Sequence, residues 1–433
     1  MYKATYISML WVMMQELIFT MNSLVDIACI NGISDDALVG ATFAMTIINL
    51  MYNTYTVFAK GARVLVSKYF GAQDENNMRS TLMTATIVCV FLAIVQGTIF
   101  LLFGNSLLSL FSLSKAQEEQ AYAYMLARLP GFFFFSFSSP ICRCAEGRGQ
   151  IARLVKFRVV NLLNIPFSII LMQFLGVAGV GWGTTLTELA ELIVLYTVFK
   201  PKFRRPTKRN FKEVLGLGAS YLPESMVSPL TNTFLNNLCL TYLSTAQIVL
   251  SQLVNKLYDC ILNIMYVSTQ HVELTVGHEY GAGNREGIIR EFKLFRHCYI
   301  RLLALHIPVT MLVGLIYLGI ISHVENLGLA LVLLLVRLLF SIPFYIELPA
   351  RRMLYIFNVI KPVMWVRFIS LVVPKLAFLY LSLRLGAGVF CLPICYLASD
   401  LPCMLVNTYL IRKGGYLKSK EEKEMCEVEA SVL

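Results

Sequence analysis

Residues 81–103 read TLMTATIVCVFLAIVQGTIFLLF and contain no Asp, Glu, Lys or Arg. A charge-free apolar run of this length can cross the hydrocarbon core of a bilayer as one helix. The rest of the chain has the same character, because 57% of its 433 residues are hydrophobic and only 15% are charged. Soluble proteins carry about 25% charged residues, so the composition predicts a membrane protein with several spans.

The predicted fold is an all-α membrane protein of about twelve transmembrane helices, because helices satisfy their backbone amides within one segment in lipid. The expected spans are about 4–30, 37–67, 79–104, 119–142, 155–175, 178–199, 213–241, 246–275, 288–320, 325–349, 359–383 and 387–411. The first span lacks a small-residue cleavage site, so we interpret it as a helix and not as a signal peptide. The eleven cysteines are scattered without metal-binding spacing, and we expect no disulfide.

The net charge of +11 comes from Lys and Arg residues that gather in alternate loops. The loops on one side include 143–158, the linker 200–212 and the tail from 412, whereas the opposite loops hold little beyond Lys115 and Arg384. The positive-inside rule makes the basic side cytoplasmic. We therefore expect a protein of the cell membrane with both termini in the cytoplasm. This distribution explains the charge without a nucleic-acid partner.

An internal repeat organises the chain. A shift of 210 residues places FGAQD (70–74) on YGAGN (280–284) and Leu-Gly at 175–176 on Leu-Gly at 385–386. The constant register predicts two pseudo-symmetric six-helix lobes, 1–199 and 213–411, joined by the cytoplasmic linker 200–212 and followed by a cytoplasmic tail, 412–433. Transporters built from parallel repeats bind substrate near the membrane midplane and alternate access by rocking their halves.

Four segments carry a resemblance to a known family: NSLVD (22–26), VSKYFGAQD (66–74), LGVAGV (175–180) and VGHEYGAGN (276–284). In their order and spacing they resemble the multidrug and toxic compound extrusion (MATE) family, bacterial type, within the group that also contains flippases of lipid-linked oligosaccharides. The resemblance implies a two-lobe antiporter that exports organic cations in exchange for Na⁺ or H⁺. No cofactor beyond this coupling ion is expected.

Asp26 is the predicted ion-coupling residue. Gln15, Asn22 and Asp26 are spaced by seven and four residues, so they share one helix face. Ionisable groups inside a membrane are costly and normally face a cavity or the protein interior. The alternative is that Asp26 only caps the turn at the outer end of its helix. The repeat partner of Asp26 is the neutral Asn236, which favours a role in ion coupling over a capping role.

The fifth span departs from the family pattern, in which an acid often follows an asparagine. Asn161 and Asn164 occupy this region, but no acid follows them. We include both asparagines in the predicted ion-coupling site.

Glu16, Glu188 and Glu191 are candidate ligands for an organic cation. Glu16 lies about 100° from Asp26 around its helix, where it either lines a central cavity or pairs with a neighbour. Thr184, Glu188 and Glu191 form one stripe on the sixth span. The two acids either bind the substrate or lie solvated near the inner leaflet.

The eighth span adds Asn255 and Asp259 to the predicted substrate site, and the second span adds Asn49, the repeat partner of Asp259. Asp259 can alternatively pair with Lys256 within the helix. In our count of mid-span charges acids exceed bases, with Lys256 and Arg337 as the bases, which favours a cationic substrate. A flippase of the same fold is expected to prefer a basic cavity, and it remains the second candidate.

An enzyme is the alternative to a transporter, but the sequence lacks the catalytic motifs that we looked for. Gly-x-Ser-x-Gly is absent, and no two histidines have metal-ligand spacing. Gly181-Trp182-Gly183 lacks the partner residues of a phosphate-binding loop. The expected partners are therefore a small cationic substrate and the bilayer, for a monomeric transporter.

Overall fold

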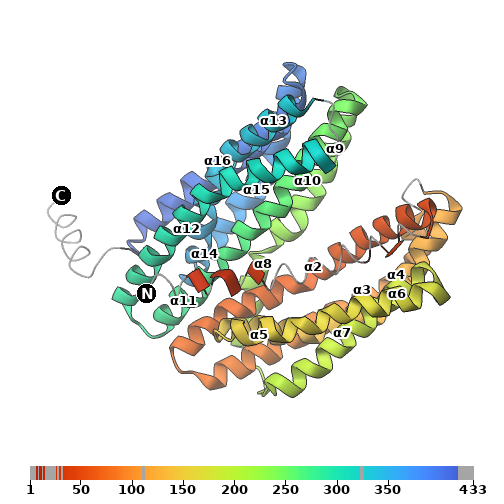
Figure 1. Ribbon diagram of the computed structural model, residues 1–433. Helices are drawn as coiled ribbons and strands as arrows, with labels where there is room; N and C mark the ends of the chain where they lie inside the picture. The colour runs from red at the N-terminus through yellow and green to blue at the C-terminus, as the bar shows by residue number, and fades with distance from the viewer. Residues whose placement is uncertain are drawn as a thin grey trace. The chain divides into compact units, whose positions relative to one another are not determined.

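The computed structural model describes residues 6–7, 9–11, 13–14, 26, 29–30, 33–109, 113–321 and 326–417. These residues form helices and turns, and no strand occurs among them (Figure 1). Eight helical segments of the described part are long and apolar enough to cross a membrane. The chain is therefore an all-helical membrane protein, as its composition predicts.

The chain divides into two compact units. The N-terminal unit contains Trp11–Tyr221, and the C-terminal unit contains Met1–Leu10 and Leu222–Leu433. We predicted a linker at 200–212, but helix α8 (Lys208–Ala219) packs on α2 and α3 of the N-terminal unit, so the division follows α8.

The N-terminal unit is centred on α4, which packs against α2, α3 and α7, while α6 packs against α7. Its elements are α2 (Asp35–Gly71), α3 (Glu75–Leu108), α4 (Lys115–Gly147), α5 (Ile151–Arg158), the 3₁₀ turn η1 (Val159–Leu163), α6 (Asn164–Leu175), α7 (Val177–Phe199) and α8.

The C-terminal unit is held together by contacts of α16 with α14 and α15, and of α11 with α12. Its elements are η2 (Pro223–Val227), α9 (Ser228–Tyr242), α10 (Thr245–Ser268), α11 (Gln270–Gly281), α12 (Arg285–Gly314), η3 (Leu315–Ile321), α13 (Leu327–Phe340), α14 (Ile342–Ile356), α15 (Ile360–Arg384), η4 (Gly388–Phe390) and α16 (Cys391–Lys413).

Observed helices occupy the described positions of the predicted spans, and six of these spans are interrupted. The spans predicted at 288–320 and 387–411 contain η3, a π-helical turn, and η4, a 3₁₀ turn. The span predicted at 155–175 contains η1, and the one at 213–241 contains a π-helical turn, η2. The spans predicted at 246–275 and 325–349 break at Thr269 and Ser341. In the span predicted at 4–30, the residues that the structure describes are helical.

The two Gly-Ala turns predicted by the repeat adopt the same conformation. After α2, Gln73 has φ +56° and Asp74 caps α3 by accepting a 3.0 Å hydrogen bond from the Asn77 N–H. After α11, Gly283 has φ +69° and Asn284 caps α12 by accepting a 3.0 Å hydrogen bond from the Gly287 N–H. The hydrogen bonds from Asn77 hold the pKa of Asp74 below its usual value.

The paired turns generate a stability test. Gly283→Ala is expected to lower the free energy of unfolding by about 1 kcal/mol, because a Cβ is penalised at positive φ. No atom lies within 4 Å of the added Cβ, so the effect is one of backbone conformation alone. Gln73→Gly is not expected to destabilise the protein, because it removes the same penalty. Thermal unfolding in detergent measures both.

Gly216→Ala is the matched control. Gly216 lies within α8 at ordinary helical φ, and an added Cβ there has no neighbour within 4 Å. Alanine is the better helix former, so this variant should be at least as stable as the wild type. Equal destabilisation by Gly216→Ala and Gly283→Ala would contradict the explanation from positive φ.

Candidate functional site

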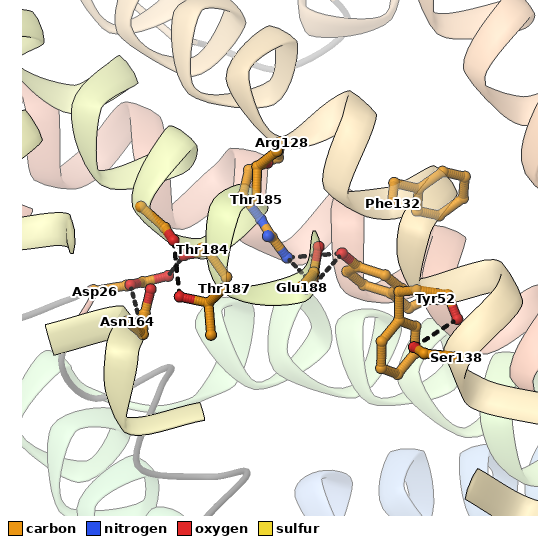
Figure 2. A network of polar contacts seen from close by, with 12 residues as sticks. Asp26, Tyr52, Arg128, Phe132, Ser138, Asn164, Thr184, Thr185, Thr187 and Glu188 are labelled. Carbon is orange, nitrogen blue, oxygen red and sulfur yellow. Dashed lines mark hydrogen bonds and ion pairs between the residues drawn. The ribbon is translucent and has the colours of Figure 1, made fainter. Parts of the chain in front are cut away.

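Asp26 lies in the interior of the N-terminal unit, with 4% of its surface exposed. Its carboxylate accepts hydrogen bonds from Asn164 Nδ2 at 2.8 Å, Thr184 Oγ1 at 2.8 Å and Tyr124 Oη at 3.3 Å. The three donors belong to α6, α7 and α4, and Figure 2 shows Asn164 and Thr184 beside the carboxylate. Asp26 therefore binds side chains of three other helices, which is more than a helix cap would need.

Three glycines of α7 allow these helices to approach closely. A Cβ at Gly179 would lie 2.2 Å from the Leu171 carbonyl oxygen of α6, and one at Gly183 would lie 2.5 Å from Ser168 Oγ. On the side facing α4, a Cβ at Gly181 would lie 2.9 Å from the Ala127 Cβ. The Gly181-Trp182-Gly183 motif therefore serves helix packing, and this packing brings the three donors to Asp26.

A second polar cluster lies next to the first. Arg128 of α4 forms an ion pair with Glu188 of α7 at 3.1 Å, and Tyr52 of α2 donates a 2.8 Å hydrogen bond to the same Glu188 oxygen. Arg128 also donates a hydrogen bond to the Tyr52 hydroxyl at 2.7 Å. In Figure 2 the Arg128 guanidinium points to Glu188 and Tyr52. The Tyr52 ring also packs on Phe132, at 5.2 Å between centroids.

Glu191, one turn after Glu188, is buried in an ion pair with Arg158. The two acids therefore face two arginines in the N-terminal unit. Our count of mid-span charges is wrong, because it omitted Arg128 and because we assigned Arg158 to the basic loop 143–158. An organic cation at either carboxylate would therefore compete with an arginine.

The other predicted site residues have different positions. Asn164 binds Asp26, whereas Asn161 is buried and its Nδ2 has no hydrogen-bond partner among the described residues. Asn49 is exposed on α2, and Asn255 is half-buried on α10. Gln15, Glu16 and Asn22 lie outside the described residues, as does the Lys256 side chain.

The C-terminal unit contains a separate cavity of about 240 Å³. Asp259 lines it together with Arg337, Arg367, Lys375 and Asp400. Our charge count included Asp259 and Arg337 but omitted Arg367, Lys375 and Asp400. Among the five residues named here, cations outnumber carboxylates by three to two.

Sequence reasoning also missed Tyr124 and Arg128. Arg128 had a readable signal, because an arginine in the middle of a predicted span is as costly as a carboxylate there. Tyr124 gave no signal, since tyrosines in membrane helices usually pack or lie at the interface.

Residues 12–170 match the family model MatE. The match covers the N-terminal part of the chain and indicates a MatE domain there. A search of curated protein sequences finds no match. Solved structures of this group share the fold over almost the whole chain.

Three solved structures illustrate the likeness. A transporter of the MOP superfamily from Pyrococcus furiosus, described as having a binding pocket of reversed polarity, has a TM-score of 0.83 at 16% identity, covering 96% of this chain and 97% of that one. An outward-facing multidrug resistance MATE transporter has a TM-score of 0.85 at 16% identity, covering 97% of each chain. MATE in a straight conformation has a TM-score of 0.85 at 16% identity, covering 96% and 97%. At these identities the likeness concerns the fold.

The Arg128–Glu188 pair generates a stability prediction. Arg128→Met alone is expected to lower the free energy of unfolding by about 3–5 kcal/mol, because it leaves a buried carboxylate without its cation. Arg128→Met combined with Glu188→Gln should recover most of this loss, because no charge then remains buried. Thermal unfolding of the two variants in detergent measures the difference. A double variant as unstable as Arg128→Met would show that the pair is not the cause.

Proposed function

We propose that this protein is a secondary active transporter that moves an organic ion out of the cell in exchange for Na⁺ or H⁺, with Asp26 as the coupling-ion site. The observation that supports this proposal is a buried carboxylate that forms no ion pair among the described residues and is held by three neutral donors. Buried carboxylates that lack a fixed cation are costly unless a proton or metal ion can join them.

The groups around Asp26 suit either coupling ion. Besides the carboxylate, the cluster offers the oxygens of Asn164, Thr184 and Tyr124, and oxygen ligands are those that hard cations prefer. A proton on Asp26 would turn one acceptor oxygen into a donor, and the Thr184 or Tyr124 hydroxyl can rotate to accept from it. Binding of the ion would therefore reorganise contacts between α4, α6 and α7.

Glu188 is poorly placed to act in the same way, because Arg128 already neutralises it at 3.1 Å. We therefore assign ion coupling to Asp26 and its donors. Glu188 and Glu191 remain candidates for substrate contact only if their arginines move. The alternating-access cycle is proposed to act in the cell membrane, with both termini cytoplasmic, as the basic loops indicate.

Organic cations are the first candidate substrates, because this is what the family resemblance implies. A lipid-linked oligosaccharide flippase is the second candidate. One observation favours it, namely that Arg337 and Lys375 lie in the cavity of the C-terminal unit. Basic residues in such a cavity suit a phosphate group, and a related MOP transporter is described as having a pocket of reversed polarity.

Transport by reconstituted vesicles tests the proposal. With a fluorescent organic cation and an imposed Na⁺ or pH gradient, wild-type protein is expected to move the probe against one of the two gradients. Asp26→Asn should reduce this coupled movement by about tenfold or more. The amide side chain has no negative charge, so it can neither take up a proton nor neutralise a bound Na⁺.

Asp36→Asn is the matched control, because Asp36 is exposed at the start of α2 and only accepts a 3.0 Å hydrogen bond from Gln117. This variant should transport normally. Normal coupled transport by Asp26→Asn would refute the assignment of that residue. Transfer of a lipid-linked sugar with no movement of the cation would favour the flippase.

A further inference from the structure

Two cations in the cavity of the C-terminal unit have no carboxylate partner in the part of the chain that the structure describes. Arg337 and Lys375 are 4% and 1% exposed, and neither forms an ion pair among the described residues. Burying a cation in a membrane protein without a counter-charge is costly, and such residues normally mark a site of function. The cavity of about 240 Å³ beside them is large enough for roughly eight water molecules or a small ionic group.

Arg337 is held by aromatic rings and one hydroxyl. Its guanidinium carbon lies 4.2 Å from the centroid of the Tyr258 ring and 3.7 Å from that of Tyr396. One terminal nitrogen donates a hydrogen bond to Ser341 Oγ at 3.1 Å, whereas the buried Nε has no partner among the described residues. A guanidinium has five N–H donors, so most of its capacity is free for a ligand.

Lys375, on helix α15, is held in a similar way. Its ammonium donates one hydrogen bond to Asn232 Oδ1 at 2.7 Å and lies 4.3 Å from the centroid of the Tyr396 ring. An ammonium has three donors, so two remain after this contact. Tyr396 therefore contacts both cations, and both line the same cavity.

The carboxylates of this cavity do not cancel its positive charge. Asp400 is already paired with Arg367 at 2.8 Å, and these two groups neutralise each other. Asp259 is exposed and has no ion pair among the described residues. Among the described residues that line the cavity, one unpaired carboxylate thus faces two unpaired cations, Arg337 and Lys375, and these lining residues carry a net positive charge.

We propose that this cavity binds the anionic group of an organic solute, a carboxylate or a phosphate, between Arg337 and Lys375, with the apolar part of the solute against Tyr258 and Tyr396. Guanidinium groups bind such anions with two parallel hydrogen bonds, and the lysine adds a point charge. The tyrosine rings supply apolar surface that ions alone would not need. The solute is therefore an anionic or zwitterionic amphiphile and not a simple cation.

The inference rests on the proposed transporter function, but it departs from the first candidate substrate, because an organic cation without an anionic group does not fit this cavity. It gives the two units opposite roles, with an uncompensated carboxylate at Asp26 in one and uncompensated cations in the other. The shared chemistry of carboxylate and phosphate allows two sources of ligand, a free organic anion or a lipid headgroup.

Binding to purified protein in phosphatidylcholine nanodiscs tests the inference without any ion gradient. Calorimetric titration with phenyl phosphate probes a free anion, and retention of phosphatidic acid in native mass spectrometry probes a lipid headgroup. Wild-type protein is expected to bind at least one of them. Asp26→Asn should keep this binding while losing coupled transport, so failure of the coupling proposal and failure of the anion site are distinguishable.

Three substitutions give a pattern that only an anion site in this cavity predicts. Arg337→Met and Lys375→Met should each weaken binding by about tenfold or more, because each removes charge-assisted hydrogen bonds. Asp259→Asn should strengthen binding severalfold, because it removes the one free negative charge. Since Asp259 is exposed, this variant also tests the inference if the two buried substitutions impair folding.

Lys413→Met is the matched control, because Lys413 is an exposed lysine 5.8 Å from the Tyr409 ring and outside the cavity. This variant should bind like the wild type. The inference is overturned if the wild type binds neither anion, or if binding is unaffected by Lys375→Met and Asp259→Asn. It is also overturned if tetraphenylphosphonium binds instead and Asp259→Asn weakens that binding.

Discussion

A charge in the low-dielectric interior of a membrane protein requires either an opposite charge or several dipoles directed at it. In the N-terminal unit Arg128 is close enough to Glu188 to form an ion pair at 3.1 Å, and Tyr52 completes that cluster. Among the described residues, only neutral side chains donate hydrogen bonds to Asp26. The distinction between these two carboxylates decides which of them is available to a mobile cation, and the functional account depends on it.

The same requirement can be met with the charges exchanged. In the N-terminal unit Arg63 forms a buried ion pair at 3.2 Å with Glu146, which joins α2 to α4. A shift of 210 residues places Glu273 on Arg63, and Glu273 forms a buried ion pair at 2.7 Å with Arg352, which joins α11 to α14. At this position the repeat therefore keeps a buried cross-helix ion pair with the signs exchanged, although the partner lies about one turn away, because Arg352 falls on Cys142 and not on Glu146.

Because the sign of the charge can differ at corresponding positions of the repeat, the two halves can share one fold and still carry different charged residues. A buried charged residue needs only a partner of opposite charge. Substitutions can therefore exchange the two signs of an ion pair in one half without altering the helices. The residues without ion pairs then set the character of each unit. Asp26 is such a residue in the N-terminal unit, and Arg337 and Lys375 are such residues in the C-terminal unit.

The sequence predicted the helices well, because runs such as 81–103 leave few alternatives in a bilayer. It also predicted the paired turns, since Asp74 and Asn284 are both capping residues. The sequence pattern could not predict which side chains donate hydrogen bonds to Asp26. Tyr124 and Thr184 are 98 and 158 residues from Asp26, and only the packing of α4 and α7 brings them together.

The interpretation of Glu188 and Glu191 as ligands for a cation depended on a count of charges and not on contacts. The stripe of Thr184, Glu188 and Glu191 was correctly placed on one helix, but its members have different partners. Thr184 binds Asp26, whereas Glu188 and Glu191 bind arginines. Spacing along one helix identifies neighbours on that helix, but it does not identify the residue opposite them on another helix.

Asp26, and not Glu188, is proposed to be the carboxylate of the N-terminal unit that accepts the coupling ion. Infrared difference spectroscopy of the purified protein, recorded on adding Na⁺ or on lowering the pH, detects this carboxylate directly through its C=O stretching bands. The account predicts a carboxyl band that disappears in Asp26→Asn and persists in Glu188→Gln. A band that persists in Asp26→Asn and disappears in Glu188→Gln would contradict it.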